Sequence, residues 1–181
     1  SQYYTQRTML AMKDDVLAGM ARIRRLGDAY AQDVVDTTFR TRNHLLGWDE
    51  GVAVVTAARN SAVQEWHALQ ALPLEGEDKA LLEQALQARV RADQAAETLQ
   101  SILQAKDIRA LGKFADSELY PAVDPLIERL DRISEHAQLR AEALVQAELT
   151  RGKWVGRVRI ALSLLCFALV ALFGRRILRN G

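Results

Sequence analysis

The feature that most constrains the fold is a helical repeat of apolar residues that covers most of the chain before residue 155. Apolar side chains recur at three- and four-residue spacing, and no strand-like alternation competes with that spacing. The 181 residues are rich in Ala, Leu, Gln, Glu and Arg, which is the composition of long helices, and only 3 are proline. The sequence therefore predicts an all-α fold.

The repeat divides into four segments, each of which predicts an amphipathic helix. Gly47 ends the first, the Pro73–Gly76 turn follows the second, and a connector with a short helix after Asp107 precedes the fourth. Asp124 and Pro125 suit the cap and first residue of the fourth helix. Short turns between such helices predict an antiparallel up-down four-helix bundle. The predicted helices cover about residues 4–46, 49–72 and 77–105, and a fourth from about 121 onward.

One segment is apolar enough for a membrane. Ile160–Gly174 contains no charged residue, and arginines flank it on both sides. Its 15 residues span about 22 Å as a helix, less than the roughly 30 Å of a hydrocarbon core, so a buried core helix is the alternative. Snorkelling arginines and an interfacial Trp154 would lengthen the span, which favours the membrane. The predicted organisation is a soluble domain (1–154), a transmembrane helix (155–174) continuous with the fourth helix, and a basic stub (175–181).

Composition argues against several other classes. A net charge of +1, without basic residues interleaved with aromatics, gives no reason to expect nucleic-acid binding. Cys166 is the single cysteine and excludes an internal disulfide, while three isolated histidines make a zinc site or another metal cofactor unexpected. The motifs GxSxG, HExxH and the P-loop are absent from the sequence, so no enzymatic activity is predicted.

Polar residues interrupt the apolar faces of the helices at one level. Counting outward from the two turns places Thr37, Arg59 and Arg89 at the same height in an antiparallel bundle. The fourth helix would contribute the stretch from His136 to Arg140. The predicted ligand-binding residues are Arg59, Arg89, Thr37, Thr38, Thr41, Tyr30, His136 and Arg140.

Two guanidinium groups inside a bundle require anionic partners, because an unpaired buried charge is costly. The planar fork of arginine suits a carboxylate, so a small organic acid would satisfy Arg59 and Arg89. The alternative is that each arginine pairs with Glu or Asp of a neighbouring helix or extends to the surface.

Three stretches resemble bacterial methyl-accepting chemotaxis proteins. TTFRTRNHLLGWDEGVAVVTAARNSAVQEW (37–66) resembles the membrane-distal turn of their sensory bundle, in which an R-x-x-x-L-x-W-x-E-G-like turn precedes A-R and then W. ELYPAVDPLIERLDRI (118–133) is similar to the entry of their fourth helix, and RRILRN (175–180) to the start of their HAMP linker. The resemblance covers roughly residues 33–180.

The resemblance implies a periplasmic sensory domain on a bacterial inner-membrane receptor that dimerises through its first helix. It implies organic-acid or amino-acid ligands, a pocket that Thr37, Thr38 and Arg59 can line, and a piston-like shift of the fourth helix. A membrane helix before Ser1 and an output module after Gly181 are then expected. Two alternatives stay open: the same input domain on a histidine kinase or diguanylate cyclase, and a ligand-free structural stalk or docking module for a periplasmic binding protein.

Overall fold

The helices of the protein follow the apolar repeat of its sequence. The computed structural model describes residues 18–143 and 145–147. Residues 18–28 are helical and lead into a π-helix, and residues 119–143 and 145–147 are helical as well. Between these stretches lie η1 (Ala29–Val34), α2 (Val35–Arg42), α3 (Trp48–Gln70), α4 (Gly76–Ala105) and α5 (Ile108–Ser117). The described residues contain no strand, so the all-α prediction is confirmed for them.

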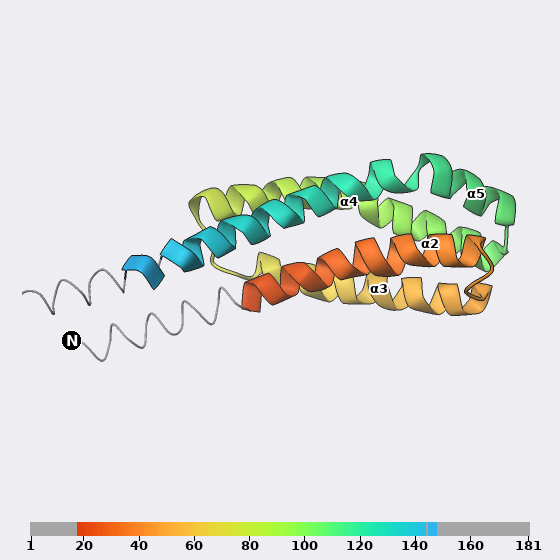
Figure 1. The fold of residues 1–181 in the computed structure, drawn as a ribbon, viewed down its shortest axis with the longest axis horizontal. Helices are drawn as coiled ribbons and strands as arrows, with labels where there is room; N and C mark the ends of the chain where they lie inside the picture. Colours follow the sequence, from red (N-terminus) through yellow and green to blue (C-terminus); the bar gives the residue numbers. More distant parts are fainter. Residues whose placement is uncertain (1–17, 144, 148–181) are drawn as a thin grey trace, which may run out of the picture. The chain divides into compact units, whose positions relative to one another are not determined.

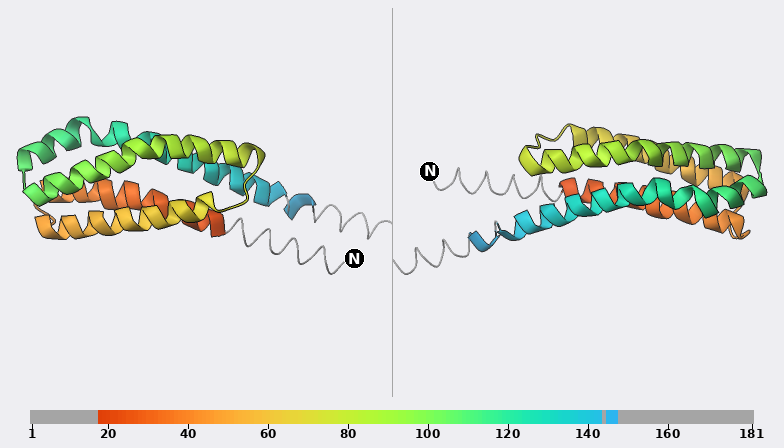
Figure 2. Two further views of the ribbon diagram at one scale, coloured as in Figure 1. Left: turned by 180° about the vertical axis from the view of Figure 1, so that it is seen from behind. Right: turned by 90° about the horizontal axis from the view of Figure 1, so that it is seen from above.

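The described residues up to Gln138 belong to one unit, and those from Leu139 onward belong to a second. Within the first unit, α3 packs against both α4 and η1, and α2 packs against α3 and α5. Figures 1 and 2 show these long helices side by side, with the direction of the chain reversing at each turn. The predicted bounds of α3 and α4 agree with the structure to within two residues.

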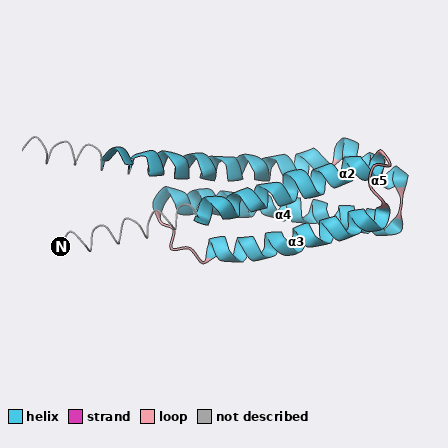
Figure 3. Cartoon of the chain, turned by 60° about the horizontal axis from the view of Figure 1, so that its bottom comes forward, coloured by secondary structure: helices cyan, strands magenta, loops and turns pink. Residues whose placement is uncertain are grey.

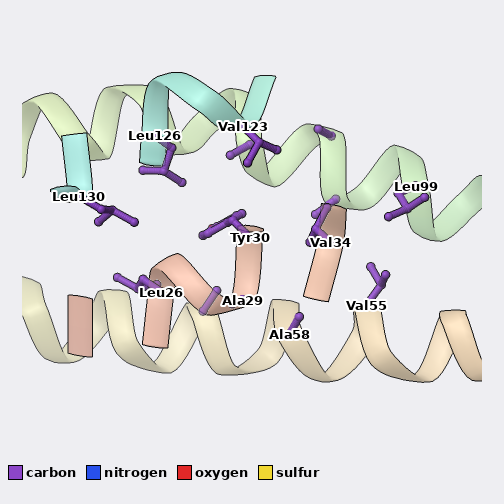
Figure 4. Close-up of a cluster of buried hydrophobic side chains, with 14 of the residues drawn as sticks. Leu26, Ala29, Tyr30, Val34, Val55, Ala58, Leu99, Val123, Leu126 and Leu130 are labelled. Carbon is purple, nitrogen blue, oxygen red and sulfur yellow. The ribbon is translucent and has the colours of Figure 1, made fainter. Parts of the chain in front are cut away.

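The core of the first unit runs along its length between the helices. Its largest fully buried side chains include Trp66, Phe114, Leu26, Leu99 and Leu126. Figure 4 shows part of this core, with Tyr30, Val123 and Leu126 drawn between the helices. The two helices α3 and α4, which pack against each other, contribute several buried alanines, and small side chains let helices approach closely. The buried alanines of these two helices are Ala58, Ala62, Ala85, Ala92, Ala95 and Ala96.

The π-helix explains a spacing that an α-helix cannot satisfy. The buried residues Leu26, Tyr30, Val34 and Thr38 follow one another at intervals of four. Each four-residue step advances an α-helix by about 40° beyond a full turn, so three steps would carry the last residue off the core face. The wider turn of η1 absorbs this drift. Leu26, at the start of this series, is fully buried, whereas its neighbour Gly27 is only partly buried.

The first long helix ends earlier than predicted. α2 stops at Arg42 rather than at Leu46, because His44 adopts a left-handed conformation with φ of 59°. The amide of Leu45 then donates to the carbonyl of Arg40 at 2.7 Å, which closes the helix with a 6→1 hydrogen bond. Gly47 serves as the N-cap of α3 instead of ending the preceding helix.

The connector after α4 is more helical than predicted. Asp107 caps α5, since its carboxylate accepts hydrogen bonds from the amides of Arg109 and Ala110 at 2.9 and 3.0 Å, so the predicted short helix is confirmed. The predicted cap at Asp124 is wrong, because the next helix already begins at Leu119 and includes Asp124 and Pro125. Burial of Leu119 and Val123 in the core favours the earlier start.

The predicted membrane segment is not among the described helices. Among the described residues, no helix combines the length and the apolar character that crossing a bilayer requires. The predicted transmembrane helix (155–174) and the basic stub after it lie outside the described residues.

Candidate functional site

Four side chains from three helices form one polar cluster in the interior. The Tyr30 hydroxyl of η1 donates a hydrogen bond to the Asp93 carboxylate of α4, and the Trp66 indole of α3 donates to the Tyr30 oxygen at 3.3 Å. Arg89 donates to Asp93 at 2.8 Å, and its guanidinium carbon lies 5.3 Å from the centroid of the Trp66 ring. Tyr30, Trp66, Arg89 and Asp93 are called the Tyr30 cluster below.

The Tyr30 cluster satisfies its own charges and hydrogen bonds. Burial raises the pKa of the Tyr30 phenol, and the hydrogen bond to Asp93 raises it further, so the phenol stays protonated and donates. Arg89 is paired with Asp93 of its own helix and also makes a cation–π contact with Trp66. These contacts give Tyr30 and Arg89 a role in joining helices.

Arg59 has a different environment. Its guanidinium donates to the side-chain carbonyl of Gln100 on α4, and the Gln100 amide donates to the Thr56 hydroxyl at 2.8 Å. The Thr56 hydroxyl in turn donates to the Val52 carbonyl at 2.7 Å. Among the described residues, no carboxylate oxygen lies within 4.0 Å of the half-buried Arg59 guanidinium. This set, Arg59 with Gln100 and Thr56, is called the Arg59 site; its one charge is positive and its partners are neutral.

The three predicted threonines of α2 are buried, and two of them, Thr37 and Thr41, lie beside Gly51 in the first turn of α3. Thr37, Thr38 and Thr41 are 3%, 0% and 2% exposed. The Thr38 hydroxyl donates to the Val34 carbonyl at 2.8 Å, whereas the Thr41 hydroxyl has no hydrogen-bond partner among the described residues. A methyl group added to Gly51 would lie 3.1 Å from the Thr41 hydroxyl oxygen, so glycine permits this close approach.

The predicted single level of Thr37, Arg59 and Arg89 is wrong. Thr37 lies against Gly51, Arg59 lies beside Gln100, and Arg89 lies on Trp66. Along α3, Arg59 is therefore roughly 10 Å from the level of Arg89 and roughly 12 Å from that of Thr37.

The linker between α3 and α4 accounts for the offset of Arg89 from Arg59. Residues 73–75 are not helical, and Glu75 is extended with φ of −132° and ψ of 162°. An extended residue advances about 3.3 Å, against 1.5 Å in a helix, so α4 begins beyond the end of α3. Figure 3 shows the loop continuing along the helices before α4 starts. Each α3 residue therefore faces an α4 residue with a higher number than a symmetric turn predicts.

Within the first unit, His136 is separate from the other predicted residues. His136 contacts the first turn of α4, with Nδ1 2.7 Å from Asp78 and Nε2 3.1 Å from Glu77. Arg140 is exposed and belongs to the second unit.

Sequence reasoning missed three polar residues that the structure brings into these sites. Gln100, Thr56 and Asp93 sit at the edges of the apolar faces, where a polar residue usually contacts solvent. Of the three, Asp93 could have been found from its spacing. It lies four residues after Arg89, which is the spacing of an ion pair within a helix. The described residues contain no group of three or more side chains suited to hold a metal ion.

Comparison with known proteins shows a distant relationship to a chemotaxis protein. The chain is 26% identical over 121 residues to the methyl-accepting chemotaxis protein NahY of Pseudomonas putida. The match covers 67% of this chain but only 22% of the length of NahY. No family model matches the chain, and no solved structure matches it significantly. The chain is thus a distant relative of a methyl-accepting chemotaxis protein, with an all-helical structure in the part described.

Proposed function

We propose that the chain is the sensory domain of a transmembrane chemoreceptor and that it binds a small organic acid or similar carboxylate. The relationship to a chemotaxis protein supports the receptor class. The proposal of a carboxylate ligand rests on the Arg59 guanidinium, which is half-buried and contacts the neutral Gln100 amide. A carboxylate is the anion that best matches the planar fork of arginine.

The Arg59 site is a better candidate than the other predicted residues. The charge of Arg89 is already neutralised by Asp93, so a ligand there would have to displace an existing ion pair. The hydrogen-bond chain through Gln100 and Thr56 to the Val52 carbonyl orients the Gln100 carbonyl toward Arg59. That chain holds the guanidinium in place, and preorganised donors lose less entropy on binding.

The proposed mechanism is a shift between two arrangements of the helices. A ligand moves such an equilibrium only by its difference in affinity for the two states. Displacement of the helix that begins at Leu119 would carry the signal across the bacterial inner membrane from a domain in the periplasm. A homodimer through the first helix is part of the proposal, and eight residues of that helix between Met20 and Gln32 line an open groove with Ile127, Asp131 and Ser134.

Calorimetric titration of the full chain with mono- and dicarboxylates, aromatic acids and amino acids tests the ligand class. We expect Arg59→Ala to weaken carboxylate binding at least about tenfold, the loss of one charge-assisted hydrogen bond, and Arg59→Lys to weaken it less. Arg91→Ala, which removes an exposed arginine of α4, is the matched control and should leave affinity unchanged. Equal affinity in Arg59→Ala and the parent chain would place the ligand elsewhere.

A second candidate is a ligand-free structural or docking module, and one observation favours it. The Tyr30 cluster, which contains two of the predicted ligand residues, is closed by its own hydrogen bonds and ion pair. If a folded chain gives no heat of binding with any of the acids, the ligand-free module is favoured.

Dimerisation can be measured separately. Cys166 is the single cysteine, so Ala31→Cys in a Cys166→Ser background places one thiol on the exposed face of the first helix. We expect oxidation to give a disulfide-linked dimer. The absence of a dimer, with Gln70→Cys on α3 as the control position, would argue against an interface through the first helix.

A further inference from the structure

The Arg59 guanidinium has hydrogen-bond donors that its neighbours do not use. Among the described residues, its hydrogen bonding is confined to the contact between Nη1 and the Gln100 carbonyl, which leaves Nε and Nη2 without an acceptor. These two nitrogens form one edge of the guanidinium, and their parallel N–H groups match the two oxygens of a carboxylate. A ligand carboxylate can therefore bind along this edge while the contact with Gln100 stays in place.

The pairing of α3 with α4 determines what surrounds this edge. The two helices pack against each other and run antiparallel (Figure 2). Val63, one turn after Arg59, and Glu97, about one turn before Gln100, therefore lie on the same side of the Arg59 site. Val63 is 44% exposed, and Glu97 is exposed as well. A ligand held by Arg59 thus has an apolar side chain and an acid beside it.

The two helices offer a single positive charge at this level. Arg59 is the one Lys or Arg of α3. In α4 the cationic side chain nearest to Gln100 in sequence is Arg91, nine residues before it and about 13 Å away along the helix axis. Lys106, just beyond the end of α4, is already paired with Asp49 at 3.0 Å. These helices can thus neutralise one carboxylate but not a second.

We propose that the Arg59 site selects acids with a single carboxylate over diacids. The carboxylate of a monoacid pairs with the unused edge of Arg59, and its uncharged body lies along Val63. The second carboxylate of a diacid finds no cation within reach and lies near Glu97, whose negative charge repels it. This inference rests on the proposed function, because it narrows the ligand class of the same site.

Calorimetric titration of the full chain at low ionic strength with matched pairs of acids tests the selection. The probes are pentanoate against glutarate, which have equally long carbon chains, and benzoate against terephthalate, which share a ring. We expect each monoacid to bind at least about tenfold more tightly than its diacid. Glu97→Gln should narrow this ratio, because it should raise the affinity for the diacids roughly three- to tenfold and for the monoacids less.

Two further variants separate this inference from the proposed function. Glu83→Gln removes another exposed acid of α4 and should leave the ratio of affinities unchanged. Gln100→Glu places a carboxylate against Arg59 and should weaken the binding of monoacids and diacids alike.

The outcomes distinguish two kinds of failure. If no acid binds the folded chain, or if Gln100→Glu binds every acid as the parent chain does, the proposed function fails and this inference fails with it. If Gln100→Glu weakens binding but diacids bind the parent chain as tightly as monoacids, the selection alone is overturned. A ratio that Glu97→Gln does not narrow, or that Glu83→Gln narrows equally, also overturns it.

Discussion

The Tyr30 hydroxyl reaches from η1 to the Asp93 carboxylate of α4, and this hydrogen bond joins two helices that are not consecutive in the chain. The Trp66 indole of α3, which lies between them in sequence, donates to the same hydroxyl. Tyr30 is 2% exposed, so the donor side of the bond is shielded from water, whereas the Asp93 side chain is 42% exposed.

Tyr30→Phe should destabilise the first unit by about 1–3 kcal/mol, because it leaves the buried Trp66 N–H without its acceptor and removes one of the two hydrogen bonds that Asp93 accepts. The aromatic ring is retained, so little packing is lost. Urea denaturation followed by circular dichroism gives the free energy of unfolding. The control is Tyr120→Phe, at a tyrosine that is 46% exposed and should have little effect. Equal effects of the two substitutions would contradict a structural role for the Tyr30 cluster.

Thr41→Val should leave stability unchanged or raise it by up to about 1 kcal/mol. The substitution removes a buried hydroxyl without a partner among the described residues and preserves the shape of the side chain. Thr38→Val is the matched comparison, since it deletes a hydrogen bond of 2.8 Å to Val34 and should cost about 1 kcal/mol. Thermal and urea unfolding give the stability of both variants. If Thr41→Val loses as much stability as Thr38→Val, the Thr41 hydroxyl has a hydrogen-bond partner.

Gly51→Ala should destabilise the protein by about 1–2 kcal/mol, since the new methyl would lie 3.1 Å from Thr41 and 3.4 Å from Thr37. Gly112→Ala in α5 should instead stabilise it by up to about 1 kcal/mol, because nothing lies within 4 Å of the added methyl and alanine favours a helix. The free energies of unfolding of the two variants should therefore change in opposite directions. Adding Thr41→Ala to Gly51→Ala should recover part of the loss, and a failure to do so would place the clash elsewhere.

Glu65 should contribute to stability in a pH-dependent way. Hydrogen bonds from Arg25 and then from Arg22 lower the pKa of Glu65, although burial opposes them. A carboxylate with a lowered pKa stabilises the folded state above its unfolded-state pKa, and this contribution disappears as the pH falls through the folded-state value. Glu65→Gln should cost about 1 kcal/mol or less at pH 7, as expected for an ion pair with exposed arginines, and nothing at strongly acidic pH.

The test of that prediction is a series of unfolding curves from pH 7 down to pH 2. Glu83→Gln, at an exposed acid of α4, is the control and should not change stability over the series. A difference between Glu65→Gln and the parent chain that stays constant with pH would show that packing, and not the charge of Glu65, is what the substitution removes.

The sequence by itself determined the helices and most of their ends. The apolar repeat has the period of a helix, and glycine, proline and capping aspartate act locally, so α3, α4 and the cap at Asp107 were all predictable. It also singled out Arg59 as a charge on an otherwise apolar face.

Only the tertiary structure decided which polar residues meet. The extended residues before Gly76 move α4 along α3, and no local pattern encodes that offset. Arg89 consequently lies on Trp66 and pairs with Asp93, while Arg59 meets Gln100 instead. The widened turn of η1 likewise keeps Leu26 and Thr38 on the same buried face. Helix formation depends on contacts within a few residues, whereas the register between helices depends on how whole faces pack, so only the first can be read from sequence.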